Sequence, residues 1–203
     1  MHIFSLLAHP RTDSFCRAIS EAARDQLTAN GHQITHHDLY AEAFDPCLKA
    51  DEAYTIGDTF EATLRRASDP LVQQHRRAIG EADGLLIVHP NWWGKPPAIL
   101  DGWMDRVLVP GVAYRLESAD GRPEALLRVQ SAVVFNTSDT EAERERLELG
   151  DPLESIWTRC VLPYCGAKDV HRHVFRPVVG SADEKRAAWL AETKDMCREA
   201  FTT

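Results

Sequence analysis

Long apolar runs are absent from the sequence. The longest uncharged apolar stretches, residues 3–8 and 85–88, are far shorter than the roughly 20 residues that a helix needs to cross a bilayer. The first residues also lack the basic region and the small-residue cleavage site of a secretory signal peptide. We therefore expect a cytoplasmic protein without membrane insertion.

Positive charge and cysteine are both scarce. The sequence has 23 Lys and Arg against 31 Asp and Glu, a formal net charge of −8, and no basic cluster is large enough to hold nucleic acid non-specifically. The five cysteines form an odd number without C-x-x-C spacing. We expect reduced thiols buried as small apolar side chains, with no disulfide and no metal site.

A glycine-rich nucleotide-binding loop is missing as well. The segment HPRTDSF, between the first predicted strand and the first predicted helix, contains neither a P-loop nor G-x-G-x-x-G. It does place the Ser14 hydroxyl, with His9 and Arg11 nearby, before a helix whose N-terminal amides favour an anion. Two interpretations stay open: a phosphate site, or a helix that Ser14 or Asp13 merely caps.

Short apolar segments and amphipathic segments alternate along the chain. Buried strands are indicated by short apolar runs, and helices by apolar residues at helical spacing. The predicted strands are residues 3–8, 32–39, 84–89, 130–135 and 170–179, and the predicted helices are residues 14–29, 70–82, 97–107, 152–164 and 182–201. This alternation predicts a single α/β domain: a doubly wound, flavodoxin-like five-stranded parallel sheet with helices on both faces.

Two segments do not fit the alternation. Residues 40–69 are expected to form a long loop with a short helix, and the charged run EAERERLE at 141–148 a solvated surface helix. Trp103 and Trp157, on predicted helices, are expected in the core.

Ligands of doubly wound sheets bind beyond the carboxyl ends of the strands, which here means residues 9–16, 89–97 and 136–140. The second segment carries the adjacent residues Trp92 and Trp93, framed by proline and glycine. Aromatic side chains in a loop can simply cover the hydrophobic core. Two in succession at this edge favour a wall for a flat ring system, and hence a planar cofactor.

The segment HPNWWGKPPAILDGWMDRVLVPGVAY, residues 89–114, resembles the hallmark of the flavodoxin-like NAD(P)H:quinone oxidoreductases. That family's pattern is a Pro-x-Trp-Trp loop, a Pro-Ala-x-Leu-x-x-Trp-x-Asp-Arg-Val helix and a Pro-Gly-x-Ala-Tyr tail. AHPRTDSF resembles its phosphate loop, DLYAEAFDP the segment after its second strand, and GDPLESIW with YCGAKDV its late helix and strand. The likeness covers nearly the whole chain in order.

The resemblance implies a flavin site, with FAD favoured narrowly over FMN. It implies phosphate-loop roles for His9, Ser14, Phe15 and Cys16, isoalloxazine contacts for Pro90, Asn91, Trp92 and Trp93, an opposing polar loop at Asn136, Thr137 and Ser138, and a cofactor contact for Arg186. No side chain is assigned as a catalytic acid or base, because backbone amides such as those of Trp92, Trp93 and Thr137 can stabilise the reduced ring. The implied reaction carries two electrons from NADH or NADPH to a quinone or similar flat acceptor in a ping-pong mechanism.

The sequence departs from the family at two places. No Tyr or His lies between Asn136 and Trp157, where animal quinone reductases carry both, so the acceptor is not carried over with the mechanism. Cys16 stands where the phosphate loop usually has Asn.

Oligomeric state and two rival functions complete the expectations. A homodimer is expected, because Trp92, Trp93, Phe60 and Tyr114 at the rim of an open site would leave an apolar patch on a monomer. The alternatives to an enzyme are a redox-sensing, flavin-binding ancillary subunit of a membrane potassium-efflux system and a flavodoxin-type electron carrier.

Overall fold

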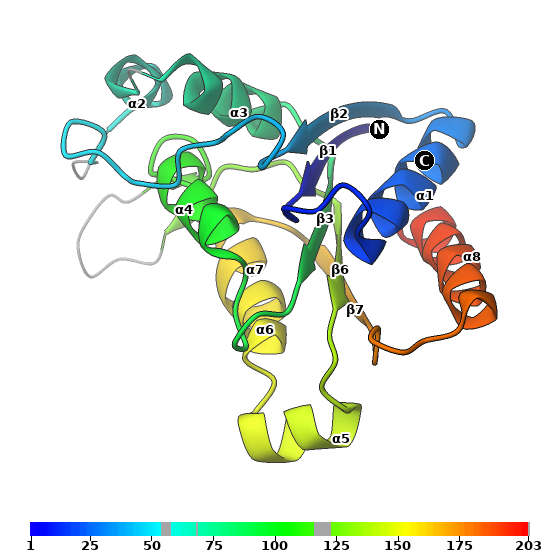
Figure 1. The fold of residues 1–203 in the computed structure, drawn as a ribbon. Helices are drawn as coiled ribbons and strands as arrows, with labels where there is room; N and C mark the ends of the chain where they lie inside the picture. Colours follow the sequence, from blue (N-terminus) through cyan, green and yellow to red (C-terminus); the bar gives the residue numbers. More distant parts are fainter. Residues whose placement is uncertain (54–57, 68, 116–122, 203) are drawn as a thin grey trace.

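Five parallel strands form the central sheet in the order β2-β1-β3-β6-β7, which confirms the predicted flavodoxin-like topology (Figure 1). The structure is a computed structural model that describes residues 1–53, 58–67, 69–115 and 123–202, without the side chain of Phe60. The strands are β1 (His2–Leu7), β2 (Gln33–Asp38), β3 (Gly84–Pro90), β6 (Ser131–Thr137) and β7 (Asp169–Phe175). A separate antiparallel pair, β4 (Tyr114–Arg115) and β5 (Glu124–Ala125), was not predicted.

Helices cover both faces of the sheet. The helices are α1 (Phe15–Ala29), α2 (Phe60–Arg66), α3 (Pro70–Gly80), α4 (Ala98–Val107), α5 (Ala142–Arg144), α6 (Pro152–Ser155), α7 (Leu162–Cys165) and α8 (Asp183–Ala200). Figure 1 shows α1 and α8 on one side of the sheet and α3, α4, α6 and α7 on the other. Among the described residues, no helix combines the length and apolarity that crossing a membrane requires.

The apolar runs of the central strands arise because both faces are buried. In β3, Leu85 and Ile87 pack in the core under α3 and α4, while Leu86 and Val88 pack in the core under α1 and α8. Successive side chains of a strand point to opposite faces, so a strand covered on both sides is apolar throughout. Trp103 is buried in the first of these cores, as predicted.

Three predicted features differ from the structure. The helix predicted over 152–164 is split by a π-helical turn, η2 (Ile156–Val161), and the strand predicted to reach 179 ends at Phe175. Beyond it, Pro177 has no amide hydrogen to continue a ladder. The expectation of buried cysteines is wrong for Cys47 and Cys160, which are exposed, while none of the five forms a disulfide.

The charged run at 141–148 is not a fully solvated helix. It forms α5 and a π-helical turn, η1 (Glu145–Leu149), which stand off the end of the sheet (Figure 1). Its neighbours are exposed, but Glu145 is only 1% exposed. A buried carboxylate needs partners, so this position has a structural task that charge patterning does not reveal.

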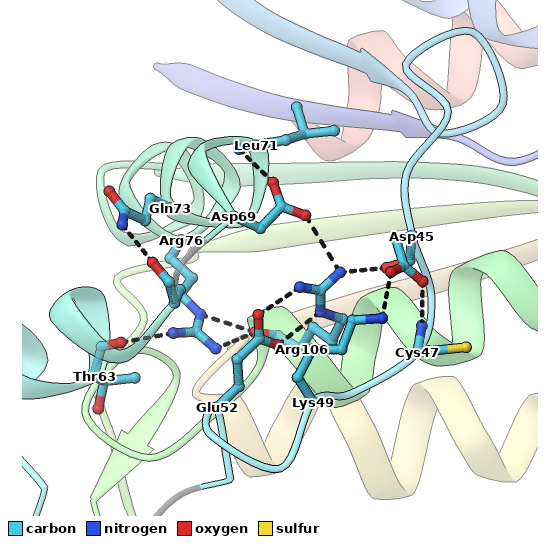
Figure 2. A network of polar contacts seen from close by, with 11 residues as sticks. Asp45, Cys47, Lys49, Glu52, Thr63, Asp69, Leu71, Gln73, Arg76 and Arg106 are labelled. Carbon is cyan, nitrogen blue, oxygen red and sulfur yellow. Dashed lines mark hydrogen bonds and ion pairs between the residues drawn. The ribbon is translucent and has the colours of Figure 1, made fainter.

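A buried ion pair fastens the segment after β2 to α4 (Figure 2). Arg106 is buried, and its Nε donates to a carboxylate oxygen of the equally buried Glu52 over 2.8 Å. Its Nη1 donates to the carbonyl of Asp45 and lies 3.4 Å from the carboxylate of Asp69. The neighbouring Arg76 donates to the carbonyl of Arg106 over 2.6 and 2.8 Å. The buried charge of Glu52 and Arg106 therefore anchors residues 45–53, most of which are exposed, to α4.

Glu52→Ala should cost about 3–5 kcal/mol of unfolding free energy, because it leaves the guanidinium of Arg106 buried without its main counter-charge. Glu124→Ala, which removes an exposed ion pair with Arg115, should cost less than about 1 kcal/mol. Urea unfolding of the two variants measures the difference. Equal effects would show that the buried pair contributes no more than a surface pair.

Candidate functional site

A hollow of about 340 Å³ lies at the carboxyl ends of β1, β3 and β6, the edge where ligands bind in open α/β sheets. It is lined by His9, Arg11, Asp13, Ser14, Phe15, Cys16, Pro90, Asn91, Trp92, Thr137, Ser138, Asp139, Val178, Val179 and Arg186. The structure thus brings the predicted cofactor residues to one place, apart from Trp93 and Asn136. Asp139 lies in the expected segment 136–140 but was given no role, and Val178 and Val179 were not predicted from sequence.

The start of α1 forms one wall of the hollow. Ser14 is the N-cap, and its hydroxyl accepts a hydrogen bond from the amide of Arg17 over 3.2 Å. The following amides, of Phe15 and Cys16, are at the positive end of the helix dipole. Capping and anion binding are therefore compatible here, since a hydroxyl that accepts from Arg17 still has its own proton to donate.

His9 and Arg11 lie on the same wall but differ in what they offer. Nδ1 of His9 accepts from the amide of Arg11 over 3.1 Å, so the neutral imidazole carries its proton on Nε2. Burial lowers the pKa of His9, which keeps the ring neutral near pH 7. The guanidinium of Arg11 donates twice to the carboxylate of Asp13, over 2.8 and 2.9 Å. His9 therefore presents a neutral donor, and Arg11 is paired at the surface.

Cys16 and Thr137 close the bottom of the hollow. The thiol and the hydroxyl lie 3.2 Å apart, and either can be the donor. Burial raises the pKa of Cys16 to about 12, so the thiol stays protonated. A neutral thiol of this kind is no nucleophile, and its bond to Thr137 joins α1 to the end of β6.

The two tryptophans occupy a tight turn and point in different directions. Trp92 and Lys95 exchange backbone hydrogen bonds of 3.2 and 3.3 Å, and Trp93 and Gly94 between them have φ of 60° and 72°. This is the two-residue turn with left-handed backbone at both central positions. Trp92 lines the hollow, with its ring 5.9 Å from that of His9, whereas Trp93 is 97% exposed.

The turn also affects the expected backbone donors. The Trp92 amide donates to the Lys95 carbonyl over 3.3 Å, so in this structure it is not free for a cofactor oxygen. The expectation that this amide stabilises a reduced ring does not fit the turn as it stands.

Asn136 is buried behind the hollow, where it belongs to a network centred on His89. The amide nitrogen of Asn136 and the indole nitrogen of Trp157 both lie 2.9 Å from Nε2 of His89, and Nδ1 of His89 lies 2.8 Å from the carbonyl of Pro90. Because Asn136 and Trp157 are both donors, Nε2 of His89 is the acceptor and Nδ1 carries the proton. Trp157 is in the core, as predicted, and Asn136 supports the strand ends from within.

Arg172 extends this network to β7. Its Nε donates to the side-chain oxygen of Asn136 over 2.7 Å, and its Nη1 lies 3.0 Å from Asp151 and 3.1 Å from Glu154. The sequence analysis missed both His89 and Arg172. The signal was present: a histidine ends the most apolar strand, and an arginine sits inside a predicted strand.

The loop from β7 to α8 forms the remaining wall. The carboxylate of Asp139 accepts from the amides of Val178 and Val179 over 2.9 and 2.7 Å. Arg186, on α8, donates to the hydroxyl of Ser181 over 2.8 Å and to the carbonyl of Val178 over 3.3 Å. Arg186 has no carboxylate among these partners, so this wall carries a guanidinium able to meet an anion.

Within the described part of the chain, one group of side chains, His37, Glu42 and His75, could surround a metal ion, with ligand atoms within 4.8 Å of one another. The indole of Trp103 donates to Nδ1 of His75 over 2.9 Å, so neutral His75 carries its proton on Nε2 and donates it to Glu42 over 3.1 Å. His37 pairs with the other oxygen of Glu42 over 2.7 Å. A metal on Nε2 of His75 would require a proton on Nδ1, facing the Trp103 N–H. The geometry therefore favours a hydrogen-bond chain.

That chain accounts for the ionisation of Glu42. Burial disfavours its charged form, but the hydrogen bonds from His37 and His75 outweigh burial and lower the pKa of Glu42 to about 2. The carboxylate stays ionised as the acceptor for both rings.

The pH dependence of stability should report on His89. Burial lowers its pKa to about 3, against about 6.5 in the unfolded chain. Its contribution is complete above pH 6.5 and is lost as the pH falls towards 3, because only the unfolded chain binds the proton in that range. In His89→Gln, whose amide can donate to Pro90 and accept from Trp157, the loss of stability between pH 7 and 5 should be smaller than in the wild type by about 2 kcal/mol.

Urea unfolding of both proteins at pH 7, 6 and 5 provides the measurement. Curves of stability against pH that run parallel would mean that His89 does not stay neutral in the fold.

Comparison with known proteins agrees with this fold. A family model described as "Flavodoxin-like fold" matches residues 1–197. The human "Ribosyldihydronicotinamide dehydrogenase [quinone]" is 28% identical over 215 residues, covering 97% of this chain and 92% of that protein. The "NAD(P)H:quinone oxidoreductase from Methanothermobacter marburgensis" is 29% identical, with a TM-score of 0.79 over 98% of each chain.

A more distant structure shares the fold. An FMN-dependent NADH-azoreductase from Bacillus anthracis, solved in complex with FMN, has a TM-score of 0.71 at 13% identity, covering 98% of this chain and 99% of that one. The chain thus belongs to the family with the flavodoxin-like fold, and its resemblance to the enzymes named NAD(P)H:quinone oxidoreductases is confirmed.

Proposed function

We propose that the protein is a flavin-dependent oxidoreductase that carries two electrons from NADH or NADPH to a quinone or a similar flat acceptor in a ping-pong mechanism. The observation that supports it is that one hollow combines three features from segments far apart in sequence. These are a helix N-terminus able to bind a phosphate, the indole of Trp92 and the guanidinium of Arg186. The relatives named as NAD(P)H-dependent quinone oxidoreductases point to the same chemistry.

The residues of the hollow fit a flavin nucleotide. Ser14, the amides at the start of α1 and Nε2 of His9 supply donors for a phosphate, and Arg186 supplies positive charge on the wall formed by the loop from β7 to α8. Trp92 and Pro90 offer apolar surface for a ring, beside the hydroxyls of Thr137 and Ser138. When bound, the flavin would accept hydride from the nicotinamide and pass it to the quinone, with a proton from solvent completing the quinol.

The protein's part is then binding, orientation and electrostatics. In the described residues, the hollow contains no neighbouring pair of side chains arranged as nucleophile and base, since Cys16 is a neutral thiol and Asp139 is bound to the backbone. Stacking of both substrates against one ring requires no proton relay from a side chain. We favour FAD narrowly over FMN because of Arg186 and the segment DLYAEAFDP, residues 38–46. The azoreductase that shares the fold was solved with FMN.

The test is to purify the protein with FAD and FMN both supplied, to identify the released cofactor by mass, and to measure oxidation of NADH and NADPH with and without a soluble quinone. We expect bound flavin and a strong increase of the rate with quinone. Flavin binding with negligible turnover would support the redox-sensing ancillary subunit or the electron carrier instead. Absence of flavin absorbance and of fluorescence quenching on titration would refute the proposal.

Ser14→Ala separates the phosphate role from capping. Loss of a cap costs about 1 kcal/mol of stability, and loss of a charge-assisted hydrogen bond to phosphate about 1.5–3 kcal/mol of binding. Thr59 is a matched control, because its hydroxyl caps α2 by accepting from Ala62 over 3.2 Å. Ser14→Ala should weaken flavin binding more than it weakens the fold. Thr59→Ala should affect the fold alone.

The proposal includes a homodimer. Trp92 is 39% exposed and Trp93 97%, and a second, apolar hollow of about 370 Å³ lies beside Met104, Tyr114 and Tyr164. Phe60, also expected at this rim, has its side chain outside the described part of the structure. Light scattering at micromolar concentration should give about twice the chain mass of 22.8 kDa. A monomeric mass would contradict it.

A further inference from the structure

Glu145 is the single buried residue in the stretch 141–150. Its neighbours Arg144 and Glu148 form an exposed ion pair, as expected of a charged surface segment. Glu145 instead has 1% of its surface exposed, and burying a carboxylate is unfavourable unless each oxygen finds a donor. The partners of Glu145 therefore show what its burial accomplishes.

Those partners come from two other loops at the carboxyl edge of the sheet. One carboxylate oxygen accepts from the side-chain amide of Asn91, and the other from the guanidinium of Arg176. Asn91 follows β3 and Arg176 follows β7, while Glu145 itself lies after β6. Arg176 also donates to the carbonyl of Thr140 over 3.4 Å. One carboxylate thus joins three of the loops that leave this edge.

Through Asn91, Glu145 influences the conformation of the turn from Trp92 to Lys95. The side-chain oxygen of Asn91 accepts from the amide of Gly94 over 3.0 Å, and the backbone amide of Asn91 donates to the carbonyl of Thr137 over 2.7 Å. An Asn side chain has a donor end and an acceptor end. Because Glu145 can only accept, it fixes the NH₂ of Asn91 towards itself and leaves the oxygen for Gly94.

We propose that Glu145 is a positioning residue: its carboxylate sets the orientation of the Asn91 amide and thereby holds the Trp92–Lys95 turn in the geometry that receives the flavin ring. This inference rests on the proposed function. Glu145 does not line the hollow, so it acts through Asn91. Arg176 neutralises its charge, so the site gains orientation without a free negative charge.

Glu145→Gln tests the orientation directly. The amide that replaces the carboxylate can accept at its oxygen, from Arg176, but its NH₂ then faces the NH₂ of Asn91. If Asn91 turns over to relieve this, its own NH₂ faces the Gly94 amide. One hydrogen bond is therefore lost in either arrangement, and we expect flavin affinity, measured by fluorescence quenching, to fall about tenfold.

Asn91→Asp in the Glu145→Gln background provides the rescue. The carboxylate now at position 91 accepts both from the new amide at 145 and from Gly94, so every donor has an acceptor and the net charge is that of the wild type. Because Asn91 itself lines the hollow, the comparison is made with the same residue at position 91 in both proteins: E145Q/N91D should bind flavin at least about threefold more tightly than N91D alone. N91D alone, which sets two carboxylates against each other, should bind at least as weakly as E145Q.

The exposed Glu148→Gln is the matched control and should leave flavin affinity and turnover unchanged. Thermal unfolding of each apo-protein separates positioning from folding, because a merely structural role would lower the melting temperature without lowering affinity at a temperature where the variant is folded. If E145Q does not fold, the comparison of the double variant with N91D decides: tighter binding by the double variant supports the proposal, and equal or weaker binding overturns it.

Two failures can be told apart. If the wild type binds no flavin, the proposed function is wrong. If the wild type binds flavin and E145Q binds it equally well, or if E145Q/N91D binds flavin no more tightly than N91D, the positioning role of Glu145 is wrong while the proposed function stands.

Discussion

The arrangement of the strand ends at the carboxyl edge of the sheet depends on one hydrogen-bond acceptor, the lone pair on Nε2 of His89. It accepts from Asn136 and from Trp157, so it connects β3, β6 and η2 at one point, and Arg172 extends the connection to β7. The hydrogen bonds of His89 can form in one protonation state and one tautomer only. The strand ends that carry the hollow are thereby held in register by hydrogen bonds as well as by the sheet ladder.

Buried charge performs the corresponding task in the loops. Arg106 and Glu52 hold the segment after β2 on α4, and Glu145 with Arg176 holds the loops after β6 and β7. Apolar residues could fill the same volumes with equal or greater stability, but they would not select one orientation of a neighbouring amide or carbonyl. Both networks therefore favour a single arrangement of loops that have little regular secondary structure of their own.

The fold was accessible from sequence because strands buried on both faces, such as residues 84–90, are apolar runs that alternate with amphipathic helices. The segments of the hollow were accessible because parallel strands end at one edge. The direction of individual side chains could not be predicted from the sequence. Trp93 turns outward because its backbone is left-handed, and Asn136 turns inward because His89 and Arg172 bind both ends of its amide. Burial of Glu145 depends on Asn91 and Arg176, which are 54 and 31 residues away in sequence.

The left-handed backbone of Trp93 has a consequence for how this sequence can change. An L-residue with a large side chain is disfavoured at φ of 60° by about 1–2 kcal/mol, and Asn or Gly would relax the turn. The indole recovers nothing by packing within its own chain, since it is almost wholly in water. Within this chain, replacing the tryptophan would therefore remove backbone strain without removing a packing contact.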